Sequence, residues 1–440
     1  MLTLFALEFP LFMLLKLLFK WSIYFIGKPR FSASKASAKP RVLLIPYNAI
    51  GDMVMTAPLF SALKQSFPDW QLEVLCSSRN HEIIRYHPAV SRCWLLDLGL
   101  KPQRALAQHR VRKTLYEQHF DKVVYLGERS NWVELWRINR LAAKGKFSLP
   151  YLQETLAKKI DPFALNIFDG VVGKDKHQAP HFTRRMMSIL SDLEAKEPEQ
   201  LTFNLNLPRV HEQDRSLPSG IKLLFNPCGS QTGNTLSDEQ TSAILTGLES
   251  LGIQVCVFDL PENRAKLAAY AHEERVHYIR SSSISDAGDW LREMALVLTT
   301  DTSMGHIAAA LEVPTLIMRA DEQWRANCDP ISDFATMLVA QPQGTIQTIT
   351  ANDVVAAVKN LLQTLPQVKW LLFLLLVILT RCDVVVLWHM HKTNYIGRIW
   401  SAIIVSLCNH ARIPRCGRAC STLTVTNSES VHVIFQTWTE

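Results

Sequence analysis

Short apolar runs alternate with helical patterns along most of this chain, and the alternation occurs twice. The first series covers about residues 41–207 and the second about residues 221–365. Strands that alternate with helices pair in parallel, because each helix returns the chain across one face of the sheet. The sequence therefore predicts an α/β protein with two doubly wound, Rossmann-like domains facing a cleft. A linker at 208–220, with two prolines and a glycine, separates them.

The individual elements follow from the apolar runs and from the polar residues between them. We expect residues 127–200 to be less regular and mostly helical. The expected strands are 42–45, 72–76, 122–126, 222–225, 253–258, 276–279, 294–298 and 313–318. The expected helices are 52–66, one opened by a capping box at 237–240 and ending near 251, 262–272 and 350–362.

Composition limits the class of protein. With 440 residues, 48% hydrophobic and 20% charged, the chain is globular and long enough for two or three domains. A net charge of +7 agrees with an anionic substrate or a membrane surface but selects neither. No aromatic-plus-basic pattern favours nucleic acid as a partner. The cysteines of the body are scattered singly, which is typical of a reducing compartment.

The N-terminal residues 1–30 predict a membrane-associating segment, followed by a linker at 31–40. Residues 11–26 are strongly apolar but include Lys16 and Lys20, which favours a helix in the membrane interface over a spanning one. Basic residues follow, so we expect the body on the cytoplasmic face of the inner membrane, held peripherally or by this N-terminal anchor. The alternative is an apolar helix that packs on the body.

The tail at 366–440 departs from the pattern of the body. An apolar run too short to span a membrane is followed by a basic stretch rich in serine and threonine. Its cysteines and His410 match no zinc spacing, so we predict no metal there and treat the tail as an accessory extension.

Polar residues follow the apolar strand expected at 294–298. Asp301, Thr302, Ser303 and His306 lie where this strand passes into a helix rich in small residues. Parallel sheets bind ligands outside the carboxyl ends of their strands, and the unpaired N–H groups of a helix N-terminus suit a phosphate. The segment therefore predicts an anion site. A structural role for His306 is the alternative, because a lone histidine in a helix is commonly structural.

A second polar turn follows the first expected strand. Gly51 turns the chain and Asp52 opens a helix, with Thr56 one turn later on the same face. Asp52 is a candidate general base, although aspartate is also a favoured helix cap. Thr56 and Asn48 are candidate residues for positioning a substrate.

Together these segments resemble glycosyltransferase family 9, the heptosyltransferase family of lipopolysaccharide assembly, over about residues 41–362. The resemblance rests on three motifs: Gly51-Asp-Met-Val-Met-Thr-Ala-Pro58, Asn226-Pro-Cys-Gly-Ser230, and Asp301-Thr-Ser-Met-Gly-His-Ile-Ala-Ala-Ala310 followed by Val313-Pro-Thr315. The first and third are specific in combination. The resemblance implies a GT-B fold, with an N-terminal acceptor domain at 41–207 and a C-terminal nucleotide-sugar domain at 221–365.

The resemblance also implies inverting transfer to a lipid-linked glycan, with a nucleotide-diphosphate sugar such as ADP-heptose as co-substrate and no cofactor. Asp52 matches the position of the family's base, which takes the proton of the acceptor hydroxyl. The helix after Asp301 would stabilise the leaving diphosphate, and Glu262 aligns, more weakly, with an acidic residue that holds the ribose. The candidate donor-binding residues are Asp301, Thr302, Ser303, Gly305, His306, Glu262 and Thr232.

Two departures from the family pattern matter. Asn234 lies where the family usually carries a lysine against phosphate, and Ser303 lies where glycine is usual. Another cation would have to serve, the donor would have to differ, or the enzyme would be weakened. The candidate cations are Arg264, Arg319 and Arg325. No Asp-x-Asp pair occurs in the chain, which agrees with a metal-independent reaction.

The altered loop at 231–236 supports a second hypothesis. In it, the chain is a catalytically weak homologue that binds a nucleotide sugar or glycan in envelope assembly. A dinucleotide oxidoreductase is disfavoured, because neither first loop has the Gly-x-Gly-x-x-Gly spacing.

Overall fold

The computed structural model describes residues 38–97, 108–127, 132–150, 166–172 and 181–363, apart from 202, 204, 211–216, 218, 230–231 and 343. The chain forms two compact units, Met1–Lys359 and Asn360–Glu440. Both sheets belong to the first unit. Of the second, only the helical residues 360–363 are described.

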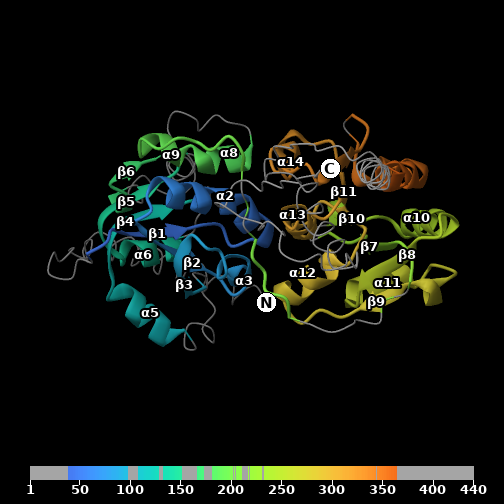
Figure 1. Cartoon of the computed structure of the whole chain (residues 1–440), viewed down its shortest axis with the longest axis horizontal. Helices are drawn as coiled ribbons and strands as arrows, with labels where there is room; N and C mark the ends of the chain where they lie inside the picture. Colours follow the sequence, from blue (N-terminus) through green and yellow to red (C-terminus); the bar gives the residue numbers. More distant parts are fainter. Residues whose placement is uncertain are drawn as a thin grey trace, which may run out of the picture. The chain divides into compact units, whose positions relative to one another are not determined.

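The first sheet has six parallel strands in the order β3-β2-β1-β4-β5-β6 (Figure 1). Its strands are β1 (Arg41–Ile45), β2 (Gln71–Cys76), β3 (Val90–Leu95), β4 (His119–Tyr125), β5 (Ala142–Ser148) and β6 (Gly170–Val171). Its helices are α2 (Ile50–Ser66), α3 (His81–Ile84), α5 (His109–Tyr116), α6 (Trp132–Asn139), α8 (Phe182–Met187) and α9 (Ile189–Asp192).

Helices cover both faces of this sheet because successive side chains of a strand point to opposite faces. Val42 and Leu44 of β1 belong to an apolar cluster with α2, α8 and α9. Leu43 and Ile45 belong to a separate cluster with α5 and α6. Burial on both faces explains why β1 is a continuous apolar run rather than an alternating one.

The second sheet also has six parallel strands, in the order β12-β11-β10-β7-β8-β9. Its strands are β7 (Lys222–Asn226), β8 (Gln254–Phe258), β9 (His277–Ile279), β10 (Leu296–Thr300), β11 (Thr315–Arg319) and β12 (Ala335–Val339). Its helices are α10 (Asp238–Ser250), α11 (Pro261–Leu267), α12 (Ile284–Arg292), α13 (Ser303–Ala310), α14 (Gln323–Ala326) and the 3₁₀ turns η4 (Thr232–Asn234), η5 (Glu273–Arg275) and η6 (Ile346–Thr348). A helix at 351–363 follows.

The two sheets share one strand order, read from opposite ends. In each, the first strand (β1 or β7) lies beside the fourth (β4 or β10), and the order reverses at that pair. Doubly wound sheets bind ligands at this switch point, at the carboxyl ends of the strands. The predicted GT-B-like α/β fold with two Rossmann-like sheets is confirmed.

Several elements differ from the sequence predictions. The expected strand at 294–298 lies two residues later, so Thr299 and Thr300 belong to β10 and are fully buried. The region expected to be mostly helical contains β5 and β6, and β3 and β12 were also missed. The burial of β5 could not be predicted, because the strand contains Lys146, a residue type that is usually exposed. In the structure Lys146 is only 2% exposed, and its Nζ donates to the Asn139 carbonyl over 2.6 Å.

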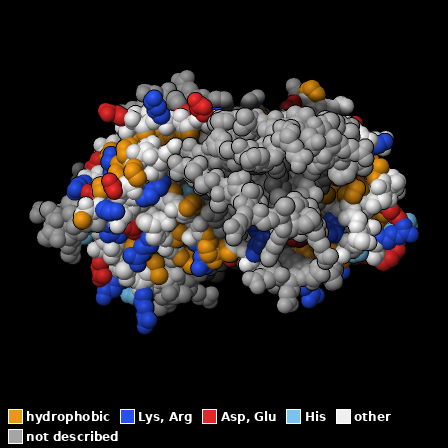
Figure 2. Space-filling view, viewed as in Figure 1, with side chains coloured by type: hydrophobic (Ala, Val, Ile, Leu, Met, Phe, Trp, Pro, Cys, Tyr) orange, Lys and Arg blue, Asp and Glu red, His pale blue; other side chains and the backbone are white. Residues whose placement is uncertain are grey.

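The predicted membrane segment at 1–30, most of the linker after it and the tail at 366–440 lie outside the described residues. None of the helices in the described ranges combines the length and hydropathy of a membrane span. On the face shown in Figure 2, basic and acidic side chains are interspersed over the described surface.

Candidate active site

Asp52 lies in the first turn of α2, directly after the turn that follows β1. Ala49 is the N-cap residue of α2, and its side chain makes no capping hydrogen bond. The interpretation of Asp52 as the helix cap is therefore wrong. Asp52 is partly buried and lies near the positive end of the α2 dipole.

The other predicted residues of this turn have different surroundings. Thr56 is 1% exposed and its Oγ1 donates to the Asp52 carbonyl over 2.7 Å. Thr56 thus supports the first turn of α2 from inside, and its hydroxyl is engaged within the helix. Asn48 is exposed in the loop before α2.

Asn80, which sequence reasoning missed, holds this loop in place. The side chain is 1% exposed, and its Nδ2 donates to the Tyr47 carbonyl over 2.8 Å. Its Oδ1 accepts from the backbone N–H of Ser77 over 2.9 Å. One buried amide therefore links the turn after β2 to the turn after β1, and no local sequence signal indicates this.

The N-terminus of α13 lies at the switch point of the second sheet. Thr302 is its N-cap residue, but the side chain makes no capping hydrogen bond. Instead, Thr302 Oγ1 lies 3.1 Å from Thr299 Oγ1 and 3.4 Å from Asn226 Nδ2. The N–H groups of Ser303 and Met304 thus receive no cap from Thr302, as a site for an anion requires.

Gly305 lies where α13 packs closely on the sheet. Its N–H donates to the Thr302 carbonyl over 3.1 Å, so it is not open to an anion as predicted. A Cβ on Gly305 would lie 2.7 Å from Ile317 Cδ1, which is closer than real Cβ atoms approach. The glycine lets α13 lie directly on the sheet, assisted by the buried Ala308 and Ala309.

His306 lies one turn into α13 and is only 8% exposed. Burial lowers its pKa to about 4; the charge of Asp301 opposes this shift and His181 adds to it. The imidazole is therefore neutral at physiological pH and can act as an N–H donor, not as a cation. A Cβ on Gly51 would lie 3.0 Å from His306 Cδ2, so the ring rests against the start of α2. The expectation that Gly51 forms a turn before the helix is wrong, because α2 begins at Ile50 and includes Gly51.

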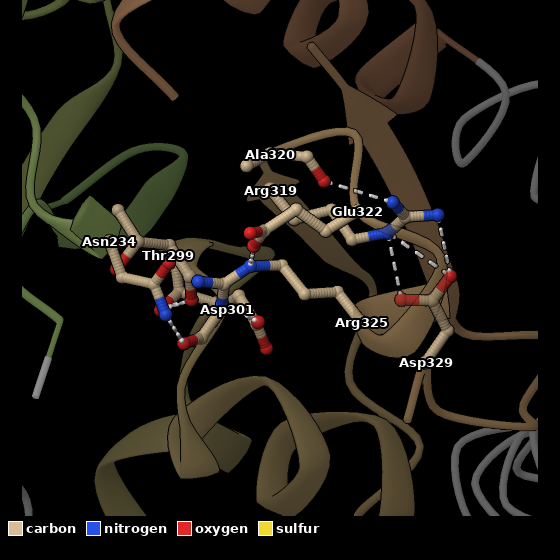
Figure 3. Close-up of polar contacts among 9 residues, drawn as sticks. Asn234, Thr299, Asp301, Arg319, Ala320, Glu322, Arg325 and Asp329 are labelled. Carbon is tan, nitrogen blue, oxygen red and sulfur yellow. Dashed lines mark hydrogen bonds and ion pairs between the residues drawn. The ribbon is translucent and has the colours of Figure 1, made fainter. Parts of the chain in front are cut away.

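The charged groups around Asp301 form ion pairs (Figure 3). Arg325 Nη1 lies 2.8 Å from Asp301 Oδ2, and Arg325 Nε also pairs with Glu322. Arg319 Nε lies 2.9 Å from Asp329 Oδ1. Two of the three arginines proposed as phosphate-binding cations are therefore already paired with carboxylates.

The third candidate cation lies elsewhere on the second sheet. Arg264 Nε lies 2.7 Å from Asp259 Oδ1, and its guanidinium lies 3.7 Å from the centre of the Tyr278 ring. Arg264 therefore has a carboxylate partner too.

Asn234, the residue in the place of the family lysine, is 5% exposed. Its Nδ2 donates to the Asp301 carbonyl over 3.3 Å, while its Oδ1 has no hydrogen-bond partner among the described residues. A Cβ on Gly229 would lie 2.5 Å from Asn234 Cβ, so the turn after β7 packs tightly on this residue. The amide links this loop to the turn before α13 without supplying charge.

The remaining donor candidates lie around the carboxyl ends of β7 and β8. Glu262 is exposed in the first turn of α11. Its carbonyl accepts from Cys228 Sγ over 3.7 Å, which links the turn after β7 to α11. Thr232 begins η4.

Contacts between the two halves of the first unit bring the two motifs together. One apolar cluster contains residues of both α2 and α13. Glu82 accepts from the N–H of Ser285 over 3.1 Å, although the residues come from α3 and α12. His181 Nε2 lies 2.7 Å from the Asp329 carbonyl, and the Phe182 N–H donates to the Asn327 carbonyl over 2.7 Å. Sequence reasoning missed Glu82 and His181, which have no local signature.

Within the described ranges, no three His, Cys, Asp or Glu residues gather as metal ligands would. Independence from metal stays a prediction.

Comparison with known sequences points to one family. The model of glycosyltransferase family 9 (heptosyltransferase) matches residues 165–345. Lipopolysaccharide heptosyltransferase 3 of Escherichia coli is 24% identical over 353 residues, which cover 71% of this chain and 95% of that protein. Lipooligosaccharide heptosyltransferase 2 of Haemophilus ducreyi is 21% identical over 296 residues, covering 62% of this chain and 81% of that protein.

Solved structures share the fold. The E. coli heptosyltransferase WaaC with ADP matches with a TM-score of 0.60 and 17% identity, over 73% of this chain and 99% of that one. The E. coli ADP-heptose lps heptosyltransferase II matches with a TM-score of 0.57 and 16% identity, over 74% of this chain and 99% of that one.

Proposed function

Because this chain belongs to glycosyltransferase family 9, we propose that it is an inverting transferase of envelope glycan synthesis. It moves heptose or a related sugar from a nucleotide-diphosphate sugar to a lipopolysaccharide or other envelope-glycan acceptor. Relatives named as heptosyltransferases, and a structural neighbour that holds ADP, support the donor class.

One observation carries the proposal. The turn that bears Asp52 touches the helix that bears the anion site, since a Cβ on Gly51 would lie 3.0 Å from His306 Cδ2. A transferase needs its base and its leaving-group site on either side of one reacting carbon. The contact between Gly51 and His306 places the proposed base, Asp52, near the proposed leaving-group site at the start of α13.

The reaction follows from the charges. Asp52 accepts the proton of the acceptor hydroxyl as its oxygen bonds to the anomeric carbon, and the bond from that carbon to the diphosphate breaks. The electron pair leaves with the diphosphate, whose charge the N–H groups at the start of α13 stabilise. Neutral His306 donates a hydrogen bond rather than charge. Glu262 and Thr232 lie on the side proposed for the nucleoside.

We also propose that the body works on the cytoplasmic face of the inner membrane. The apolar, lysine-containing segment at 1–30 motivates this, because an acceptor linked to lipid is presented at that surface. Loss of vesicle binding on deletion of residues 1–30 would support the proposal, and unchanged binding would contradict it.

Replacement of Asp52 tests the base. Asp52→Asn should lower kcat by on the order of 10³-fold while the affinity for the nucleotide changes little, because the residue does not contact the diphosphate. The measurement is transfer from ADP-heptose to a truncated lipopolysaccharide, with ADP binding measured by calorimetry. Turnover that survives the change refutes the assignment.

The surroundings of Asn234 favour one alternative function. The amide at this position is neutral, and Arg264, Arg319 and Arg325 are all paired with carboxylates. In this alternative, the chain is a weak catalyst that binds a nucleotide sugar or glycan in envelope assembly. Nucleotide binding without sugar hydrolysis or transfer, across a panel of ADP, UDP, GDP and CMP sugars, would select this alternative.

A further inference from the structure

The Asp301 carboxylate presents an electrostatic problem at the proposed diphosphate site. Asp301 comes directly before Thr302, the N-cap residue of α13, and its side chain is 24% exposed. A diphosphate bound at the start of α13 would therefore lie near a second negative charge. In a partly buried site such a charge weakens anion binding, because solvent screens it incompletely.

Arg325 faces this carboxylate from α14. Its Nη1 lies 2.8 Å from Asp301 Oδ2, and only 6% of its side chain is exposed. Its Nε pairs with Glu322, whose side chain is 47% exposed and therefore well screened by solvent. Figure 3 shows the guanidinium reaching between Glu322 and Asp301, with Asn234 on the far side of Asp301.

The backbone of Asp301 is held independently of this ion pair. Its N–H donates to the Met318 carbonyl over 3.0 Å, and its carbonyl accepts from Asn234 Nδ2 over 3.3 Å. These two bonds fix the turn between β10 and α13 from neighbouring elements. Loss of the Arg325 side chain should therefore change the charge at the turn more than the path of the chain.

We propose that Arg325 is a positioning residue whose task is to neutralise and orient Asp301, so that the start of α13 accepts the diphosphate of the donor. This inference rests on the proposed function. Arg325 acts through Asp301 and makes no contact with phosphate. The guanidinium suits the task because it stays charged at any physiological pH and binds two carboxylates at once.

A second-site rescue experiment tests the proposal on the full chain, with ADP, inorganic pyrophosphate and adenosine as probes in calorimetry. Arg325→Gln leaves the Asp301 charge uncompensated, so the Kd for ADP and pyrophosphate should rise about 30-fold. Removal of that charge as well, in Asp301→Asn/Arg325→Gln, should return the Kd to within about threefold of wild type. Adenosine, which has no charge, should bind all variants equally.

Two further variants control for folding. Arg325→Lys keeps the charge and should bind ADP within about fivefold of wild type. Arg319→Gln removes a similarly buried arginine that is paired with Asp329. It should lower the melting temperature while changing the Kd for ADP less than about threefold.

The outcomes separate this inference from the proposed function. A double variant as weak as Arg325→Gln would show that Arg325 itself contacts the phosphate, and would overturn the inference alone. Adenosine affinity that falls in parallel with ADP affinity would indicate general disruption and would also overturn it. A wild-type protein that binds no nucleoside diphosphate would refute the proposed function, and the inference with it.

Discussion

Gly51 and His306 touch, although they belong to the first and last motifs of the chain: a Cβ on Gly51 would lie 3.0 Å from His306 Cδ2. The contact explains why a glycine is required at this turn, whose backbone does not depend on a left-handed conformation. It also gives His306 a packing role that does not depend on its charge. The neutral ring packs against the start of α2, the helix that contains Asp52.

Gly51→Ala should therefore push the turn away from His306. A contact at 3.0 Å forces a shift of a few tenths of an ångström, with a cost of about 1 kcal/mol and an about tenfold loss of transfer. In a His306→Ala background the same change should cost little stability, because the partner atoms are gone. Thermal unfolding of the four proteins measures this coupling. Gly233→Ala is the matched control, since a Cβ there meets nothing within 4 Å; an equal loss in this control would contradict the explanation.

Asn80→Asp should loosen the loop before α2. An aspartate keeps the acceptor for Ser77 but replaces the donor that binds the Tyr47 carbonyl with a buried negative charge. The expected cost is about 3 kcal/mol of stability, with a fall in kcat larger than any change in nucleotide affinity. Urea unfolding and steady-state kinetics check this. Equal losses of kcat and nucleotide affinity would argue against a loop-specific effect.

Asn234→Lys should strengthen donor binding if charge at this position limits it. A cation there adds a charge-assisted contact to phosphate, which should lower the Kd for ADP about tenfold. Asn234→Met is the control, because it removes the amide without adding charge and should weaken binding slightly. Calorimetry that finds no difference between lysine and methionine would place the diphosphate away from Asn234.

Acid should destabilise the protein partly through His87. Burial lowers the pKa of His87 to about 4, from an ordinary value near 6.5. Its Nδ1 accepts from the Ala89 N–H over 3.2 Å, which requires the neutral ring. The stabilising effect of the neutral form is thus complete above pH 6.5 and is lost as the pH falls towards 4.

His87→Asn keeps an acceptor and cannot titrate in this range. Between pH 7 and pH 4, wild type should lose on the order of 3 kcal/mol more stability than this variant. Chemical unfolding at both values measures the difference. Identical pH dependence in the two proteins would show that His87 is solvated in the folded state.

The parts that were predictable from sequence are those whose signals are local. β1 and β10 are apolar runs that end in polar turns, and the capping box at Ser237 and Gln240 formed as expected. Two motifs that carry the family resemblance, Gly51–Pro58 and Asp301–Ala310, lie in or directly before the helices that follow these strands. β3 and β5 escaped prediction because Arg92 and Lys146 interrupt their apolar patterns, although Lys146 is buried.

The site was less predictable, because its chemistry depends on pairs distant in sequence. Nothing near Asp301 indicates that Arg325 neutralises it, and nothing near Gly51 indicates a histidine ring against it. Thr56 and Gly305 have the expected positions along the chain, but their polar groups are engaged internally. Which side of a residue faces a ligand is decided by packing, which the pattern does not encode.

The shared strand order of the two sheets has a consequence for engineering. Each half has its own switch point. Under the proposed function, donor choice and acceptor choice should therefore be separable by exchanging one half with that of a relative. Such a chimera would have to preserve the contacts between Gly51 and His306, Glu82 and Ser285, and His181 and Asp329. A candidate half from a relative could therefore be checked for residues that preserve these three contacts before the chimera is made.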